Sequence, residues 1–391
     1  MSFPSLGGGS DSRYPLMKKM VSVGGFLLAP FSYEYKTKFK QIKNRRKSMK
    51  IVVLCGGVST ERDVSLVTGS QVYRALKGKG HKVILLDIFL GYTGEIEGLF
   101  EKDIDWDAKI SGVKSIAPDL EAIKAMRKNP EVLFGENVIN ICKMSDIVFM
   151  GLHGDYGENG KVQAAFDLYG IKYTGTDYIS SAMAMDKSIT KKVFEMEGVK
   201  TPASIVLRKG EGEGIPEFPC VVKVCSGGSS IGVYIVRNQK EYDMAINDAY
   251  NYDDKLLVEQ YIKGREFTDG VIDGQALPVV EIAPKEGFYD YKNKYQEGST
   301  IETCPAKLTD EQTLAIQGLA VKAYKALGIL AYARMDFVMD EKTGEIYCLE
   351  ANTLPGMTPT SLIPQEAAAV GVGFPELCEW IINVSLKKYN R

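Results

Sequence analysis

Two apolar runs near the carboxyl end of the chain, at 332–339 and 345–352, constrain the fold more than any other feature of the sequence. A short polar segment that ends in Gly344 separates them. Two such runs around a glycine-containing turn are typical of an antiparallel β-hairpin. Because side chains alternate between the two faces of a strand, polar residues in these runs must emerge at fixed positions on one face or the other.

Four of the polar side chains in this predicted hairpin are candidate ligands. Arg334 and Asp336 share one face of the first strand, and Glu350 and Asn352 share one face of the second. A register that joins these faces makes Asp336, Glu350 and Asn352 converge. Mg²⁺ prefers oxygen ligands, takes few of them from protein and fills the rest with water and phosphate oxygens. The hairpin is therefore a candidate magnesium and phosphate site, and the alternative is a surface hairpin with solvated charges.

Length, charge and composition narrow the class of protein. A chain of 391 residues can form two or three domains of about 100–200 residues each. The net charge of −2 argues against a nucleic-acid partner, and no run of about 18 apolar residues suggests a membrane span. Seven scattered cysteines without a C-x-x-C pair indicate reduced thiols and a cytoplasmic protein. Only His81 and His153 are present, which excludes a histidine-rich zinc site.

Residues 1–48 differ from the rest of the chain. They begin rich in glycine and serine, pass through a short apolar run and become basic from Lys36 onward. A signal peptide would need a small-residue cleavage site after the apolar run, and a basic tract stands there instead. We interpret 1–48 as a disordered extension or a misassigned start, with Met49 as the natural initiator.

The first half of the remaining chain has the pattern of a parallel sheet. Residues 50–57 form an apolar run that ends in paired glycines, and a helical pattern follows it, as in the first βα unit of a Rossmann-like domain. Residues 81–87 and 145–153 are further buried strands. The polar, weakly periodic residues 91–135 are read as an insertion. Strand-rich runs then alternate with a helical pattern at 310–327, so the expected class is α/β and α+β.

A glycine and serine loop at 225–232 joins two predicted strands. Its backbone N–H groups and the Ser229 and Ser230 hydroxyls can bind phosphate oxygens. Lys223, just before the loop, and Lys187, in the segment Met-Asp-Lys-Ser, are candidate phosphate ligands. The alternatives are a flexible turn and two solvated lysines.

The end of the strand predicted at 255–262, with the residues just after it, is a candidate nucleotide contact. An extended edge through Gln260, Tyr261 and Ile262 can bind adenine through its backbone, and the carboxylates of Glu259 or Glu266 can bind ribose hydroxyls. This indication is weak from composition alone.

Two further loops are candidates for ligand contact. Residues 288–298 are aromatic and cationic and lie between glycines, as expected of a closing lid. His153 lies in a glycine-rich loop after a buried strand, where open α/β sheets bind ligands. A lone histidine there is more often structural than catalytic.

Taken together and in this order, these segments resemble D-alanine–D-alanine ligases of the ATP-grasp superfamily over residues 49–391. The motifs that carry the resemblance are Gly56-Gly-Val-Ser-Thr-Glu-Arg-Asp-Val-Ser-Leu66, Leu152-His-Gly154, Met185-Asp-Lys187, Gly228-Ser-Ser-Ile-Gly232, Phe288-Tyr-Asp-Tyr291 with Lys294-Tyr295, Arg334 with Asp336, and Leu349-Glu-Ala-Asn-Thr353 with Pro355-Gly-Met-Thr358. The resemblance implies a Rossmann-like domain at 49–175 and a two-subdomain ATP-grasp fold at 176–263 and 264–391.

The resemblance also implies an activity and its residues. ATP would phosphorylate one D-alanine, and the amine of a second D-alanine would attack the acyl phosphate, to supply D-alanyl-D-alanine for peptidoglycan. Two Mg²⁺ ions, replaceable by Mn²⁺, and a homodimer are expected. The resemblance implies phosphate binding by Lys187, Lys223 and Lys294, and oxyanion binding by Arg334 and the Gly356 N–H. It implies that Glu61 and His153 bind the first D-alanine and that Glu61 forms a hydrogen-bonded link with Ser229 and Tyr295. It also implies that Ser361 and Leu362 contact the second D-alanine.

Three alternatives remain from the sequence. A sister ligase would join D-alanine to D-serine or D-lactate, although Tyr295 favours an amine nucleophile by family pattern. A noncatalytic nucleotide-binding relative would be expected to lack Arg334 or a metal ligand, and both are present. A dinucleotide-binding oxidoreductase would need G-x-G-x-x-G after the first strand, and that spacing is absent.

Overall fold

The computed structural model describes residues 48–110, 119–211, 217–228, 232–284 and 300–390, together with two short strands before them. Those strands, β1 (Val21–Val23) and β2 (Phe26–Leu28), pair antiparallel. The contacts divide the chain into one unit at Met1–Lys47 and a second at Ser48–Arg391. The expected lid at 288–298 lies outside the described residues.

The second unit begins with a parallel sheet, as the sequence predicted. Its strands are β3 (Lys50–Cys55), β4 (Lys82–Asp87) and β5 (Ile147–Met150), in the order β4-β3-β5. Helix α2 (Arg62–Gly78) connects the first two strands and packs on both. All of β3 beyond its first residue is buried, which explains why that run is apolar throughout.

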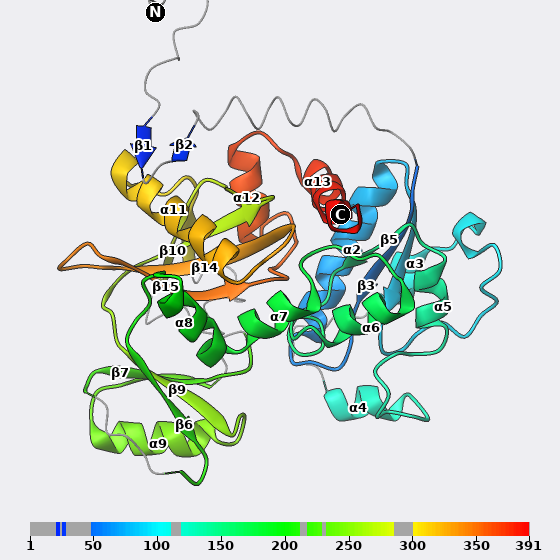
Figure 1. The fold of residues 1–391 in the computed structure, drawn as a ribbon. Coiled ribbons are helices and arrows are strands. Elements are labelled where there is room, and N and C mark those ends of the chain that lie inside the picture. Colours follow the sequence, from blue (N-terminus) through cyan, green and yellow to red (C-terminus); the bar gives the residue numbers. More distant parts are fainter. Residues whose placement is uncertain are drawn as a thin grey trace, which may run out of the picture. The chain divides into compact units, whose positions relative to one another are not determined.

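In its described residues, the predicted insertion contains short helices. They are η1 (Leu99–Glu101), α3 (Trp106–Ile110) and α4 (Leu120–Ala125), followed by α5 (Val138–Lys143) before β5. Asp119 caps α4 by accepting a hydrogen bond from the backbone N–H of Ala122. After β5, three helices lead out of the parallel sheet: α6 (Lys161–Tyr169), α7 (Tyr178–Met185) and α8 (Lys187–Met196) (Figure 1).

A four-stranded antiparallel sheet follows. It has the order β6-β9-β7-β8, formed by β6 (Ser204–Arg208), β7 (Cys220–Val224), β8 (Val233–Val236) and β9 (Lys255–Gln260). Helix α9 (Gln239–Ala249) packs its apolar face against the buried side chains of this sheet.

The third sheet contains the predicted hairpin. Its path is β13-β12-β10-β14-β15, with β11 beside β10. The strands are β10 (Gly264–Ile272), β11 (Gln275–Ala276), β12 (Val280–Pro284), β13 (Thr300–Thr303), β14 (Tyr332–Asp340) and β15 (Ile346–Asn352). Helix α11 (Asp310–Ala326), which starts with a capping box at Thr309, packs on this sheet. The predicted helix and hairpin are both present.

The end of the chain returns to the parallel sheet. Helix α12 (Leu362–Ala369) lies on β10, whereas α13 (Phe374–Leu386) packs on α2, and η2 (Lys387–Tyr389) follows it (Figure 1). Lys79 at the end of α2 ion-pairs with Glu376 of α13 at 2.9 Å. In the described part of the chain, no single helix is long and apolar enough to cross a membrane. Only α12 and α13 taken together meet this length and composition, and the chain bends by 102° at the break between them.

Candidate active site

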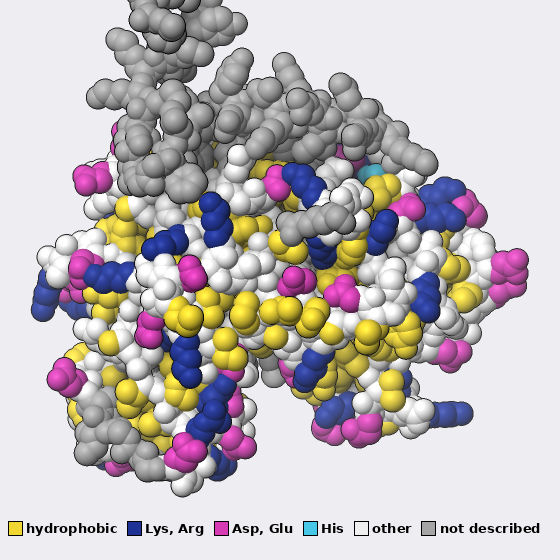
Figure 2. Space-filling view, viewed as in Figure 1, with side chains coloured by type: hydrophobic (Ala, Val, Ile, Leu, Met, Phe, Trp, Pro, Cys, Tyr) yellow, Lys and Arg dark blue, Asp and Glu magenta, His cyan; other side chains and the backbone are white. Residues whose placement is uncertain are grey.

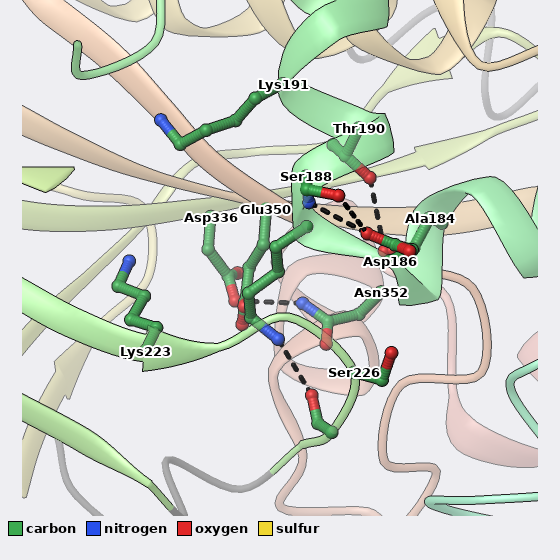
Figure 3. A network of polar contacts seen from close by, with 12 residues as sticks. Ala184, Asp186, Ser188, Thr190, Lys191, Lys223, Ser226, Asp336, Glu350 and Asn352 are labelled. Carbon is green, nitrogen blue, oxygen red and sulfur yellow. Dashed lines mark hydrogen bonds and ion pairs between the residues drawn. The ribbon is translucent and has the colours of Figure 1, made fainter. Parts of the chain in front are cut away.

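The register of β14 and β15 brings the four candidate side chains of the hairpin together. Arg334 lies opposite Asn352, and Asp336 lies opposite Glu350. The Asn352 amide donates a hydrogen bond from Nδ2 to Asp336 Oδ2 at 2.9 Å. Figure 3 shows Asp336, Glu350 and Asn352 side by side on this sheet. The convergence predicted from strand alternation is confirmed.

Arg334 makes a bidentate contact with Asp336. Its Nε lies 2.8 Å from Oδ1 and its Nη2 lies 2.7 Å from Oδ2. The Thr268 hydroxyl on β10 donates a further hydrogen bond to Asp336 Oδ1 at 2.6 Å. Such paired contacts fix both groups more firmly than a single hydrogen bond does.

The donor set of the hairpin fits a hard divalent cation. Asp336, Glu350 and Asn352 offer carboxylate and amide oxygens. Elsewhere in the described residues, no group of three or more His, Cys, Asp or Glu side chains is arranged to hold a metal. A set of two carboxylates and one amide suits Mg²⁺, because Mg²⁺ keeps positions for water and phosphate oxygens.

A cavity of about 430 Å³ lies between the second and third sheets and reaches the hairpin. Its walls come from β7, β8 and β9 on one side and from β10, β12, β14 and β15 on the other. Many of the site residues predicted from the sequence line this cavity. They are Lys187, Lys223, Glu259, Gln260, Tyr261, Ile262, Glu266, Asp336 and Glu350.

Two lysines face this cavity. Lys187 begins α8, where its Nζ donates a hydrogen bond to Gly227 O at 2.8 Å and lies 3.7 Å from Glu350 Oε2. Lys223 on β7 ion-pairs with Glu259 at 2.5 Å. Burial works against the Lys223 ammonium, but Glu259 outweighs burial and raises the pKa of Lys223.

The predicted adenine-binding edge is partly wrong. Strand β9 lies inside the sheet, hydrogen-bonded to β6 on one side and to β7 on the other. Only after Gln260 does the chain leave the sheet, so Tyr261 and Ile262 border the cavity outside any strand. The Glu259 carboxylate is 2% exposed and contacts two lysines, which leaves Glu266 as the better candidate for a ribose contact.

A second group of predicted residues surrounds Glu61, which directly precedes α2 and is 8% exposed. An added Cβ on Gly154 would lie 2.7 Å from Glu61 Oε2, and one on Gly228 would lie 3.2 Å from the same atom. The carboxylate of Glu61 therefore sits between the loop after β5 and the glycine loop after β7.

His153 is held by two neighbours. Its Nε2 lies 2.9 Å from Thr68 Oγ1 and its Nδ1 lies 3.0 Å from Leu354 O. Burial lowers the pKa of His153, against the attraction of Glu61. A neutral imidazole has a single N–H, which Nδ1 donates to the Leu354 carbonyl, so Nε2 accepts from the Thr68 hydroxyl.

The turn after the hairpin contains Gly356, Ser361 and Leu362. Ser361 Oγ accepts a hydrogen bond from the Thr358 N–H at 3.0 Å and lies 3.1 Å from the position of a Cβ on Gly356. Ser361 directly precedes α12, and Leu362 begins it. The predicted residues Ser229, Ser230, Lys294 and Tyr295 lie outside the described part of the chain.

Sequence reasoning missed Lys191 and Glu158. Lys191 lies four residues after Lys187, one turn along α8, and is 2% exposed. Glu158 accepts a hydrogen bond from the Gly154 N–H at 2.8 Å, and burial, with Glu61 nearby, raises its pKa to about 8. The helical spacing from Lys187 was a visible signal for the first of these, whereas nothing in the sequence marks Glu158.

Comparisons with known proteins match this arrangement. Residues 50–176 match the family model described as the D-ala D-ala ligase N-terminus, and residues 192–383 match the one described as its C-terminus. The D-alanine–D-alanine ligase of Pediococcus pentosaceus is 44% identical over 350 residues, which cover 88% of this chain and 99% of that protein.

Two solved structures extend the comparison. The D-alanine–D-alanine ligase from Bacillus anthracis, complexed with ATP, has a TM-score of 0.68 at 31% identity and covers 88% of this chain and 99% of its own. The D-Ala:D-Ser ligase VanG from Enterococcus faecalis has a TM-score of 0.66 at 30% identity and covers 87% and 100%. The fold is that of an ATP-dependent enzyme of the ATP-grasp class. The chain belongs to the D-alanine–D-alanine ligase family.

Proposed function

We propose that the protein joins two molecules of D-alanine and converts ATP to ADP and phosphate, with D-alanyl phosphate as the intermediate. The observation that carries this proposal is the single cavity that joins Lys187 and Lys223 to the carboxylates of Asp336 and Glu350. Its product would be D-alanyl-D-alanine for peptidoglycan. Family membership supports both substrates.

ATP is placed in this cavity between the two antiparallel sheets. Tyr261 and Ile262 border the adenine, Glu266 binds the ribose, and Lys187 and Lys223 neutralise the phosphates. A triphosphate next to a carboxylate concentrates negative charge, so electrostatic positioning is the main requirement. Ser229, Ser230 and Lys294 complete the phosphate contacts in this proposal.

Asp336, Glu350 and Asn352 would hold magnesium, which supplies charge neutralisation between the phosphates when it is bound. The family resemblance supports two ions, with Mn²⁺ as a substitute. Asp336 pairs with Arg334, and Glu350 lies 3.7 Å from Lys187, so a cation at the hairpin would share these carboxylates with two basic side chains.

The first D-alanine is placed between Glu61, which binds its ammonium, and Arg334, with His153 nearby. One of its carboxylate oxygens attacks the γ-phosphorus, and ADP leaves. The amine of the second D-alanine then attacks the acyl carbon, and the phosphate leaves from the tetrahedral intermediate. Arg334 and the Gly356 N–H stabilise the oxyanion of that intermediate.

The second D-alanine is placed at the start of α12, where Ser361 and Leu362 face its carboxylate. Tyr295 and Ser229 link the lid to Glu61 in this proposal. The similarity to a D-Ala:D-Ser ligase makes D-serine the main competing second substrate. Shape alone excludes an added hydroxyl poorly, by a factor of about 100.

Phosphate release with D-alanine alone, and with D-alanine paired with D-serine or D-lactate, tests the proposal. D-alanine alone is expected to give the highest kcat/KM. Faster turnover with D-serine or D-lactate would assign the protein to a sister ligase. ATP binding without turnover on any of these substrates would identify a noncatalytic relative.

A homodimer in the cytoplasm is part of this proposal. Large apolar side chains are exposed on α6 and at the start of α7, at Leu168, Tyr169, Tyr178 and Ile179. Figure 2 shows apolar side chains gathered over α7 and the helices beside it. Light scattering at micromolar concentration is expected to give the mass of two chains, and the mass of one would contradict the dimer.

All seven cysteines are free, as in a reducing compartment, and cell fractionation tests the proposed cytoplasmic location.

A further inference from the structure

Lys191 is a buried cation with three polar neighbours. It lies on α8 with 2% of its surface exposed. Its Nζ donates hydrogen bonds to Thr201 Oγ1 and to Pro202 O, both at 2.7 Å, and lies 2.8 Å from Glu259 Oε1. A buried ammonium is costly unless it is paired in this way. The family roles assigned above leave Lys191 without a function.

The Glu259 carboxylate is shared between two lysines. Its Oε1 faces Lys191, and its Oε2 lies 2.5 Å from Lys223 Nζ. Lys223 lines the cavity, whereas Lys191 does not. In Figure 3, the side chains of Lys191 and Lys223 come from α8 and β7 and reach toward the same region.

The charges of Lys191, Glu259 and Lys223 contribute to what the cavity presents to a nucleotide, beside those of the other charged residues that line it. Lys223 and Glu259 alone would cancel, so a phosphate would meet no net charge there. Burial lowers the pKa of Lys191, and the attraction of Glu259 opposes that effect. With Lys191 protonated, two cations and one anion leave one net positive charge. Both lysines outweigh burial and lower the pKa of Glu259, so its carboxylate stays ionised. Screening by solvent is weak at these buried positions, which makes the balance effective.

We propose that Lys191 is a positioning residue for ATP: it holds Glu259 and balances its charge, so that Lys223 offers an uncancelled positive charge to the nucleotide. This inference rests on the proposed placement of ATP in the cavity. The competing view is that Lys191 only ties α8 to residues 201 and 202.

Steady-state kinetics of four variants separate these views. K191M removes the buried cation. K191R keeps the charge. K192M is the matched control, because Lys192 is the next residue on the same helix and is exposed. K191M/E259Q removes the cation together with the anion that it balances. The KM for ATP, the KM for D-alanine, kcat and the melting temperature are measured for each.

K191M is expected to raise the KM for ATP by about tenfold or more, as the loss of a charged contact does elsewhere. The KM for D-alanine and kcat should change by less than about threefold, and K192M should behave like the native protein. K191R should recover part of the loss. K191M/E259Q should bind ATP better than K191M, because Lys223 regains its net charge.

A K191M/E259Q variant no better than K191M would overturn the inference, since a purely structural lysine gains nothing from E259Q. Should K191M fail to fold, the double variant decides: a folded protein with a KM for ATP within about threefold of native supports charge balance, and any other result contradicts it. The K223M variant tests the placement of ATP separately from the role of Lys191. If K223M leaves the KM for ATP unchanged, the proposed placement of ATP is itself wrong.

Discussion

Arg334 and Asp336 lie two residues apart on β14, and the guanidinium of Arg334 holds both carboxylate oxygens of Asp336, at 2.8 and 2.7 Å. The residue proposed to stabilise the oxyanion is thus tied to a residue proposed to hold magnesium. A cation at Asp336 competes with this ion pair, because both use the same oxygens. Metal binding is therefore expected to loosen the hold of Asp336 on Arg334.

The R334M variant tests the role of the guanidinium. It removes one oxyanion donor, and losses of this kind lower kcat about 10²- to 10³-fold in other enzymes. The KM for ATP should stay within about threefold of native, because Lys187 and Lys223 are unchanged. Phosphate release at saturating D-alanine measures the effect. R208M, at an exposed position of β6, is the control, and retained turnover in R334M would contradict the assignment.

The E350Q variant tests the metal site. It keeps the shape of Glu350 but removes one of the two carboxylates opposite each other on β14 and β15. Magnesium affinity depends on ligand charge, so the Mg²⁺ concentration for half-maximal activity should rise about tenfold or more. Titration of activity with Mg²⁺ and with Mn²⁺ measures this. E345Q, an exposed glutamate at the other end of the same hairpin, should leave the titration unchanged. Equal curves for E350Q and native protein would remove Glu350 from the metal site.

The hairpin shows how much the sequence determines. Two-residue alternation placed Arg334 and Asp336 on one face, and the observed register joins them to Glu350 and Asn352. The apolar runs of the parallel sheet were equally readable, because strands buried on both faces need apolar residues throughout. These predictions rest on residue patterns within short segments of the sequence.

Long-range pairing was not readable in the same way. Strand β9 was expected at an edge, but it lies between β6 and β7, strands that come earlier in the chain. The burial of Lys191 depends on Glu259, which is far away in the sequence. No local pattern marks either relation, because each arises when separate segments pack.

The G154A variant tests the position of Glu61. Gly154 has φ +72°, and an added Cβ would lie 2.7 Å from Glu61 Oε2. Alanine there costs about 1–2 kcal/mol of backbone strain and also displaces the carboxylate. The KM for D-alanine should rise about tenfold through the weakened ammonium contact.

The control for G154A is G274A. Gly274 has φ +74°, and no atom lies within 4 Å of an added Cβ, so G274A carries the strain without the contact. Both variants should lose similar stability in thermal unfolding. A similar KM for D-alanine in the two variants would argue against Glu61 as the ammonium ligand.

Asp269 and Glu366 form a buried acidic pair behind the hairpin, each with 0% exposure. Glu366 Oε2 accepts a hydrogen bond from the Gly270 N–H at 2.8 Å. Among the described residues, neither oxygen of Asp269 nor the other oxygen of Glu366 has a hydrogen-bond partner. Burial raises the pKa of both carboxyls well above the usual range, and Asp269 adds to the effect on Glu366.

The pH dependence of stability follows from these directions. An acid whose pKa is raised by folding keeps a proton that the unfolded chain has lost, so the free energy of unfolding falls as pH rises above the unfolded pKa of about 4. E366Q resembles the protonated form and keeps the acceptor for Gly270. Relative to native protein, E366Q should therefore gain about 1 kcal/mol of stability per pH unit until the folded pKa is reached. Urea unfolding between about pH 5 and pH 9 measures the difference, with exposed Glu311 replaced in E311Q as the control. Parallel curves for E366Q and native protein would mean that Glu366 is ionised in the folded state, because only then does its removal leave the slope unchanged.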